Sequence, residues 1–169
     1  MPALFALDQN FPEPIVDALD AFIPEAELVP LREIDPLLTA DMDDWEVLLA
    51  LSHHPQAWDG LVTTDSGILN LPKELAVLMQ TKLTLVVAEA AGHDPVRATG
   101  LVLTHLSWIA KKTNPSEAQL WRLSANNRPA RDPWEALRRV ADHQNRDVDA
   151  LWREARLTKA ELAVDPLGL

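Results

Sequence analysis

Leu83-Thr84-Leu85-Val86-Val87-Ala88 is the most strand-like stretch of the chain. It is apolar at nearly every position, contains several β-branched residues, and lies between Lys82 and Glu89. Such a run is typical of a strand buried on both faces, as the strands of parallel sheets are. Two more short apolar runs precede it, at residues 4–7 and 61–64, and residues 27–31 between them are a plausible further strand. We therefore expect a mainly parallel sheet.

The segments between these runs carry helix signals. One helical pattern lies between Pro12 and Pro24, Asp43 or Asp44 can cap a second, and Pro72 is well placed as the first residue of a third. Strands that alternate with helices of these lengths indicate βαβ units, in which helices cover a parallel sheet. The sequence therefore predicts an α/β fold with a mainly parallel central sheet.

After residue 90 the pattern becomes purely helical. Helices are predicted over residues 95–111, from Pro133 behind a capping Asp132, and through residues 148–155. We expect residues 1–90 to form the α/β core. Residues 91–169 would then be a helical extension that packs on this core within the same domain.

The composition narrows the class of protein. The 169 residues suffice for one domain with a sizeable core, and 47% of them are hydrophobic, which argues against disorder. No run of about 18 apolar residues could span a membrane, and no export signal is visible, so we expect a cytoplasmic protein without a membrane partner. With no cysteine in the chain, disulfides and thiolate metal sites are excluded.

Charge is distributed unevenly along the chain. Residues 1–90 hold 16 acidic and three basic residues, for a net charge of −13, whereas residues 91–169 hold 10 acidic and 12 basic residues, for +2. The acidic first half would repel nucleic acid unless cations offset it. The second half offers phosphate contacts, although its arginines also suit solvated helix faces. These arginines are Arg122, Arg128, Arg131, Arg138, Arg139 and Arg146.

Acidic residues follow two of the predicted strands. Asp8 ends the first apolar run and Asp65 ends the third, while residues 41–46 form an acidic knot at the start of a predicted helix. In an open parallel sheet the ligand crevice lies outside the carboxyl ends of the strands. Asp8, Asp65 and one acid of the knot are therefore candidates for one divalent-cation site.

Mg²⁺ suits such oxygen ligands and keeps several bound waters, one of which can attack a phosphodiester. Thr64 and Asn10 are candidates for holding a carboxylate or a bound water by hydrogen bonds. A structural interpretation stays open, because Asp8 also suits a turn and the knot acids also suit a helix N-terminus. Within the knot, Asp44 is the first candidate, with Asp43 and Glu46 behind it.

The chain resembles the PIN-domain nucleases at these residues. The resemblance lies in residues 7–12 (Leu-Asp-Gln-Asn-Phe-Pro), 44–46 (Asp-Trp-Glu) and 62–65 (Val-Thr-Thr-Asp), and it is closest to the group whose first motif reads Asp-x-Asn-Leu-Pro. It covers roughly residues 3–90. It implies a three-layer α/β/α fold and a ribonuclease that uses Mg²⁺ or Mn²⁺ held by Asp8, Asp44 and Asp65. Many such proteins are toxins of toxin–antitoxin pairs, which implies an antitoxin partner, and a homodimer is a further expectation.

One position departs from the family pattern. In the family, another acid usually stands two residues after the acid that corresponds to Asp65. Here that position is Gly67, followed by Ile68. Asn70 is a candidate substitute. The departure keeps an alternative open, in which the chain is a PIN-like module without catalysis that serves in protein interaction or regulation.

Overall fold

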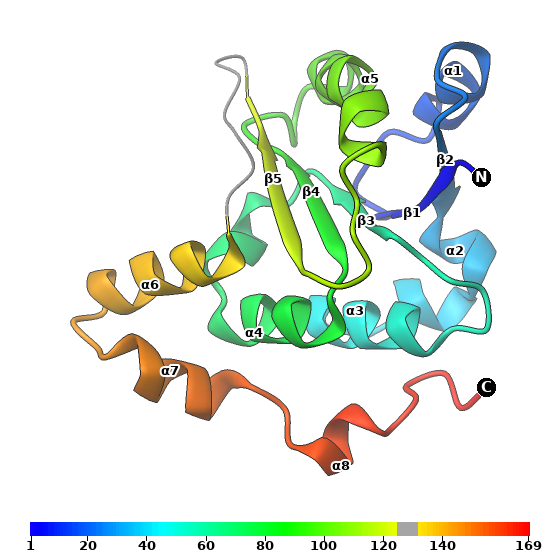
Figure 1. The fold of residues 1–169 in the computed structure, drawn as a ribbon. Coiled ribbons are helices and arrows are strands. Elements are labelled where there is room, and N and C mark those ends of the chain that lie inside the picture. The colour runs from blue at the N-terminus through cyan, green and yellow to red at the C-terminus, as the bar shows by residue number, and fades with distance from the viewer. Residues whose placement is uncertain (125–131) are drawn as a thin grey trace.

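The computed structural model describes residues 1–124 and 132–169 and shows a single five-stranded sheet (Figure 1). Every pair of neighbouring strands is parallel, and the strand order is β2-β1-β3-β4-β5. The predicted α/β class and parallel sheet are confirmed. The strands are β1 (Ala3–Leu7), β2 (Ala26–Pro30), β3 (Gly60–Thr63), β4 (Thr84–Ala88) and β5 (Gln119–Leu123).

Helices cover both faces of the sheet. The α-helices are α1 (Ile15–Phe22), α2 (Leu31–Ile34), α3 (Asp44–His53), α4 (Pro72–Thr81), α5 (Pro95–Ala110), α6 (Pro133–His143), α7 (Val148–Ala155) and α8 (Lys159–Leu162). Two 3₁₀ helices, η1 (Pro36–Thr39) and η2 (Ser66–Asn70), complete the set. Among the helices of the described residues, none combines the length and apolarity that a membrane crossing requires.

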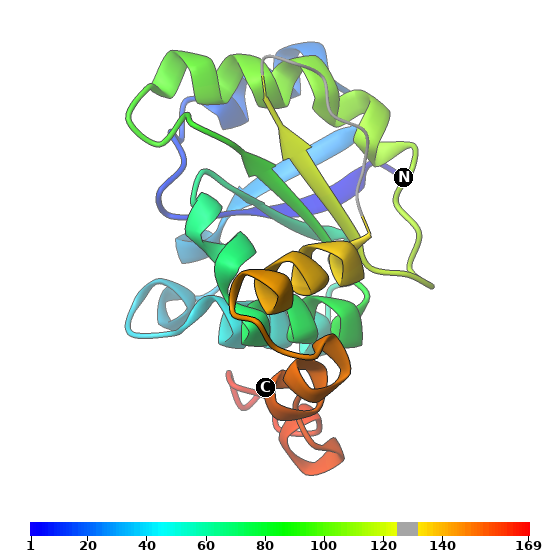
Figure 2. The same cartoon turned by 90° about the vertical axis from the view of Figure 1, so that its left-hand side faces the viewer.

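The sheet separates two hydrophobic cores. One core lies between the sheet and helices α1 and α5, and the other lies between the opposite face and helices α3, α4, α6 and α7. Figures 1 and 2 show α1 and α5 together on one side of the strands and the remaining long helices on the other. All side chains of β1, β3 and β4 are buried, as expected for strands covered on both faces. The arrangement is that of a three-layer α/β/α fold.

The expectation of a purely helical second half is wrong. Residues 119–123 form strand β5, which pairs in parallel with β4 along its whole length. Residues 91–169 therefore complete the same sheet rather than only adding helices to a finished core. Strand β5 contains the polar residues Gln119 and Arg122, which an edge strand allows. Because these residues break the apolar pattern, the strand was not predicted from the sequence.

The strand order changes direction in the middle of the sheet. After β1 the chain adds β2 on one side, and then crosses over to add β3, β4 and β5 on the other side. The switch in direction therefore lies between β1 and β3, where ligands of open α/β sheets usually bind. Helices α3 and α4 each precede a strand and run back across the sheet, so their N-terminal ends lie at the carboxyl ends of the strands as well.

Candidate functional site: an acidic edge at the ends of β1 and β3

Thr63 links the ends of the two central strands. Its hydroxyl donates a hydrogen bond to Oδ2 of Asp8 at 2.6 Å and accepts one from the backbone N–H of Asp65 at 3.0 Å. The backbone N–H of Asp8 also donates to the carbonyl of Val62 on β3. One hydroxyl thus fixes the position of the carboxylate after β1 and of the backbone after β3.

Asp8 is a buried carboxyl group. Its exposed fraction is 8%, and burial is the main cause that raises its pKa above the ordinary value. The negative charge of Asp65 raises it further, while the hydrogen bond from Thr63 works in the opposite direction. A carboxylate in this position is costly without a compensating charge, because desolvation penalises its ionised form.

Asp44 lies at the first residue of α3 and is half-buried. Burial and then the charges of Asp8 and Asp65 raise its pKa to about 6, with smaller contributions from Glu74 and Asp43. The structure therefore brings the three predicted metal ligands to one edge, close enough to repel one another. We call Asp8, Asp43, Asp44, Asp65 and Glu74 the acidic edge.

Glu74 is the member of the acidic edge that the sequence analysis missed. It lies in the first turn of α4, is half-buried, and has a pKa raised first by burial and then by the charge of Asp43. An acid in a first helical turn is ordinarily explained by the helix dipole, so the sequence pattern did not distinguish Glu74 from other such acids. Pro72 was the available signal, because it places the start of this helix soon after Asp65.

Asp43 and Glu46 have structural roles at the start of α3. The carboxylate of Glu46 accepts a hydrogen bond from the backbone N–H of Asp43 at 2.9 Å, as in a capping box. Oδ2 of Asp43 accepts from the indole N–H of Trp45 at 3.3 Å, and the ammonium group of Lys73 lies 3.7 Å above the same indole ring. These contacts favour Asp44 over its two neighbours as the ligand from the acidic knot.

Gly67 has a local reason to be glycine. Its backbone N–H donates to Oδ1 of Asp65 at 2.7 Å, and a Cβ atom at this position would lie 2.8 Å from the same oxygen. A side chain here would push against the carboxylate that the backbone holds. The position where the family carries another acid therefore serves, in this chain, to orient Asp65.

The remaining candidates lie around the acidic edge in different roles. The hydroxyl of Thr64 is 3.4 Å from the backbone carbonyl of Asn10, so the threonine that holds a carboxylate is Thr63 instead. The side chain of Asn10 is exposed. Asn70 lies at the end of η2 and lines a neighbouring cavity.

Asp44→Asn should stabilise the metal-free protein at neutral pH. The pKa of Asp44 is about 6 in the folded protein and 3.8 ordinarily, so the folded protein binds this proton more tightly than the unfolded chain does. The ionised carboxyl group therefore lowers the free energy of unfolding above pH 6, and this effect disappears below about pH 4. The full shift corresponds to about 3 kcal/mol, and losing an acid from the first turn of a helix offsets part of it. We expect a gain of about 2 kcal/mol at pH 7 in EDTA and little gain near pH 4, measured by urea denaturation.

Asp41→Asn is the control for this measurement. Asp41 belongs to the same acidic segment but is exposed, and it contributes nothing to the raised pKa of Asp44. The substitution Asp41→Asn removes the same charge as Asp44→Asn, so a general effect of net charge would stabilise both variants equally. Equal gains in the two variants, or a gain in Asp44→Asn that persists unchanged to pH 4, would show that Asp44 is not held in a repelling cluster.

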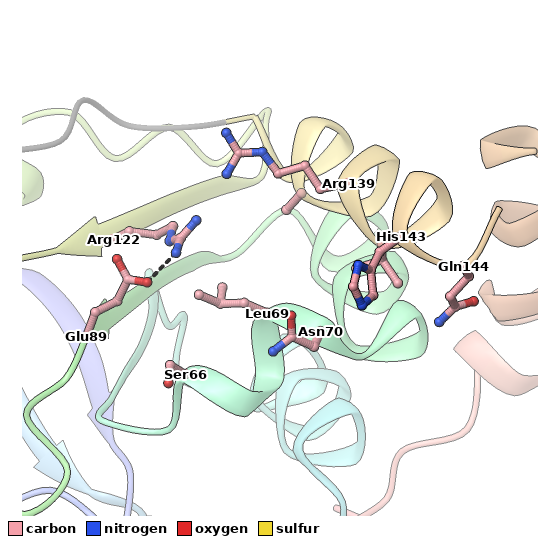
Figure 3. Close-up of a pocket in the computed structure, with 10 residues that line it drawn as sticks. Ser66, Leu69, Asn70, Glu89, Arg122, Arg139, His143 and Gln144 are labelled. Atoms are coloured by element: carbon pink, nitrogen blue, oxygen red, sulfur yellow. Dashed lines mark hydrogen bonds and ion pairs between the residues drawn. The ribbon is translucent and has the colours of Figure 1, made fainter. Parts of the chain in front are cut away.

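A cavity of about 780 Å³ adjoins the acidic edge (Figure 3). Arg122 and Arg139 line it, so two of the arginines expected to contact phosphate lie at one place. Arg138 is exposed on the same helix as Arg139, and Arg146 pairs with Glu154. Arg128 and Arg131 lie outside the described residues.

Within residues 1–124 and 132–169, no three His, Cys, Asp or Glu side chains are gathered closely enough to form a metal-binding group. In comparisons with known proteins, no family model, no curated protein and no solved structure matches the chain.

Proposed function

We propose that this protein is a metal-dependent ribonuclease of PIN-like fold, with Asp8, Asp44 and Asp65 as the ligands of Mg²⁺ or Mn²⁺. One observation carries the proposal. Asp8 and Asp65 follow the two strands that flank the switch in strand order, and their charges raise the pKa of Asp44 at the start of α3. The resemblance of the surrounding motifs to PIN-domain nucleases supports the same assignment.

The donor atoms suit the proposed cation. Carboxylate oxygens are the ligands that Mg²⁺ and Mn²⁺ prefer, and no sulfur or imidazole ligand competes among the residues of the acidic edge. Because like charges repel, the carboxylates are expected to approach one another when a cation offsets their charge. When bound, the cation would supply charge neutralisation and Lewis acidity for the hydrolysis of a phosphodiester.

The protein contributes the positions of these groups. The hydroxyl of Thr63 holds Asp8, and the backbone N–H of Gly67 holds Asp65, so neither carboxylate has to be ordered when substrate arrives. The N-terminal ends of α3 and α4 add positive dipole ends to the same edge, which favours anions there. The charge of Glu74 contributes to the raised pKa of Asp44, so Glu74 is the acid that would take the place of the one absent at Gly67.

The direct test is incubation of the purified protein with mixed single-stranded RNA in Mn²⁺, in Mg²⁺ and in EDTA. We expect cleavage in the presence of either metal and none in EDTA. Absence of cleavage by a folded preparation under all three conditions would contradict the nuclease proposal. From the resemblance we propose further that the protein is a toxin with an antitoxin partner, and a small reading frame beside the gene would support this role.

Metal binding should raise the stability of the folded protein. At a Mn²⁺ concentration of about 100 times its dissociation constant, we expect the free energy of unfolding to rise by about 2.7 kcal/mol. For a chain of this length this corresponds to an increase in Tm of roughly 5 to 10 °C. The measurement is a thermal melt with and without Mn²⁺ at equal ionic strength.

Two variants test whether the cation binds at the acidic edge. Asp8→Asn should lose most of the metal-dependent increase in Tm, whereas Asp41→Asn should keep it, because Asp41 lies outside the acidic edge. An equal increase in both variants would place the cation elsewhere on this acidic protein.

The absence of an acid at Gly67 favours a second candidate function, a PIN-like interaction module without catalysis. Metal binding without cleavage would support this alternative. Cleavage that requires Asp65 would exclude it.

A further inference from the structure

The cavity beside the acidic edge is built from four separate segments. Leu69 and Asn70 come from η2, Glu89 follows β4, Arg122 lies on β5, and Arg139, His143 and Gln144 come from the end of α6 and the residue after it. In Figure 3, Glu89 and Arg122 lie at the end of the sheet and Arg139 and His143 on α6, whereas Gln144 lies farther away beyond the end of α6. Its volume of about 780 Å³ lies within the range that holds small ligands.

Arg122 is the cation held most firmly in this cavity. Its guanidinium group pairs with the carboxylate of Glu89, and the side chains are only 20% and 16% exposed. In the part of the chain that the structure describes, its Nε atom is buried without a hydrogen-bond partner. A ligand in the cavity can therefore contact this guanidinium only through its terminal nitrogens, one of which pairs with Glu89.

Arg139 is the second cation of the cavity. It is exposed and forms no ion pair among the described residues, and it reaches the cavity from α6. Glu89 offsets one of the two arginines, so the cavity keeps an excess of positive charge in a protein with a net charge of −11. Positive charge of this kind, flanked by neutral polar groups, is suited to a phosphate.

The rest of the lining suits a planar heterocycle. Leu69 and Val140 are buried apolar residues that offer a surface for stacking or packing. Asn70 and Gln144 carry both donors and acceptors, which is what the hydrogen-bonding edge of a nucleobase requires. A base can occupy such a cavity only when it is unpaired, because a base pair hides this edge.

We propose that this cavity binds one nucleotide of a single-stranded RNA, with its phosphate at Arg139 and Arg122 and its base against Leu69 and Val140. That the bound nucleotide belongs to RNA rests on the proposed nuclease function. Ser66 connects the two sites, because it lines the cavity and directly follows Asp65. When one nucleotide of an RNA is bound in the cavity, the neighbouring phosphate of the RNA would lie at the acidic edge.

The test measures binding without metal, so that catalysis does not enter. The full chain in EDTA is titrated with each of the four ribonucleoside 5′-monophosphates, with the corresponding nucleosides and with inorganic phosphate. We expect at least one mononucleotide to bind more tightly than either its nucleoside or phosphate alone. Single-stranded RNA should displace it, and a duplex of the same sequence should not.

Arg139→Gln and Arg138→Gln form a matched pair of variants. The two arginines are adjacent on α6 and both exposed, but only Arg139 lines the cavity. Arg139→Gln should weaken mononucleotide binding about tenfold or more, and Arg138→Gln should leave it nearly unchanged. Ala136→Trp, which fills the cavity without changing its charge, should abolish binding in a protein that still melts cooperatively.

Three results would overturn the inference. They are absence of mononucleotide binding, equal losses in the two arginine variants, and binding of phosphate as tight as that of any mononucleotide. Mononucleotide binding that single-stranded RNA does not displace would overturn the assignment to RNA. The nuclease proposal fails separately, when folded protein that binds mononucleotides in EDTA cleaves no RNA in Mn²⁺.

Discussion

Asp65→Asn is expected to lower the rate of Mn²⁺-dependent RNA cleavage about a thousandfold, equivalent to about 4 kcal/mol of transition-state stabilisation. Asparagine keeps the size of the side chain and an oxygen that can accept the hydrogen bond from Gly67, but it removes a charge from the acidic edge. The metal-free fold should therefore be as stable as the wild type, or slightly more so. Cleavage is measured under single-turnover conditions in Mn²⁺, and stability by thermal melting in EDTA.

Asp35→Asn is the control for this substitution. Asp35 also caps a 3₁₀ helix, with its carboxylate accepting from the backbone N–H of Leu37 at 2.8 Å, but it contributes nothing to the pKa shifts of the acidic edge. It should cleave RNA at the wild-type rate. Wild-type cleavage by Asp65→Asn would refute the metal-ligand assignment, and a clearly lower Tm in EDTA would make Asp65 a structural cap like Asp35.

Gly60→Ala should destabilise the protein by at least about 3 kcal/mol. Gly60 begins β3 and pairs directly with Thr84 on β4, and a Cβ atom at Gly60 would lie 1.8 Å from the backbone carbonyl oxygen of Thr84. The clash can be removed only if β3 and β4 move apart, because the clashing oxygen belongs to the backbone rather than to a flexible side chain. We expect a decrease in Tm of roughly 6 to 12 °C, and a loss of the metal-dependent stabilisation because Asp65 lies just after the end of β3.

Gly100→Ala is the matched glycine variant. Gly100 lies within α5, and a Cβ atom there would meet nothing within 4 Å. The same change should stabilise the protein by about 0.5 to 1 kcal/mol, because glycine is a poor helix former. A Gly60→Ala variant as stable as the wild type would mean that β3 and β4 do not pair in this register.

Short-range patterns in the sequence determined much of the fold. The apolar runs that become β1, β3 and β4 are each predicted to within a residue or two, because a strand covered on both faces must be apolar along its length. Strand β2 is predicted as closely, although Glu27 on it is exposed. Pro72 and the pair Asp132-Pro133 marked the starts of α4 and α6, since capping and the fixed φ of proline are local properties. Asp8 and Asp65 followed as strand-end residues.

Only the tertiary structure decided which strands are neighbours and what else reaches their ends. Strand β5 escaped prediction because its membership in the sheet depends on pairing with β4, which lies 30 or more residues earlier in the chain. The hydrogen bond between Thr63 and Asp8 joins residues 55 positions apart, and the raised pKa values of Asp44 and Glu74 arise from burial and from charges on other elements. The cavity of Arg122 and Arg139 depends on both β5 and α6. Desolvation and Coulomb repulsion act through space rather than along the chain, so the sequence determined the individual acids, and the fold alone determined their common edge.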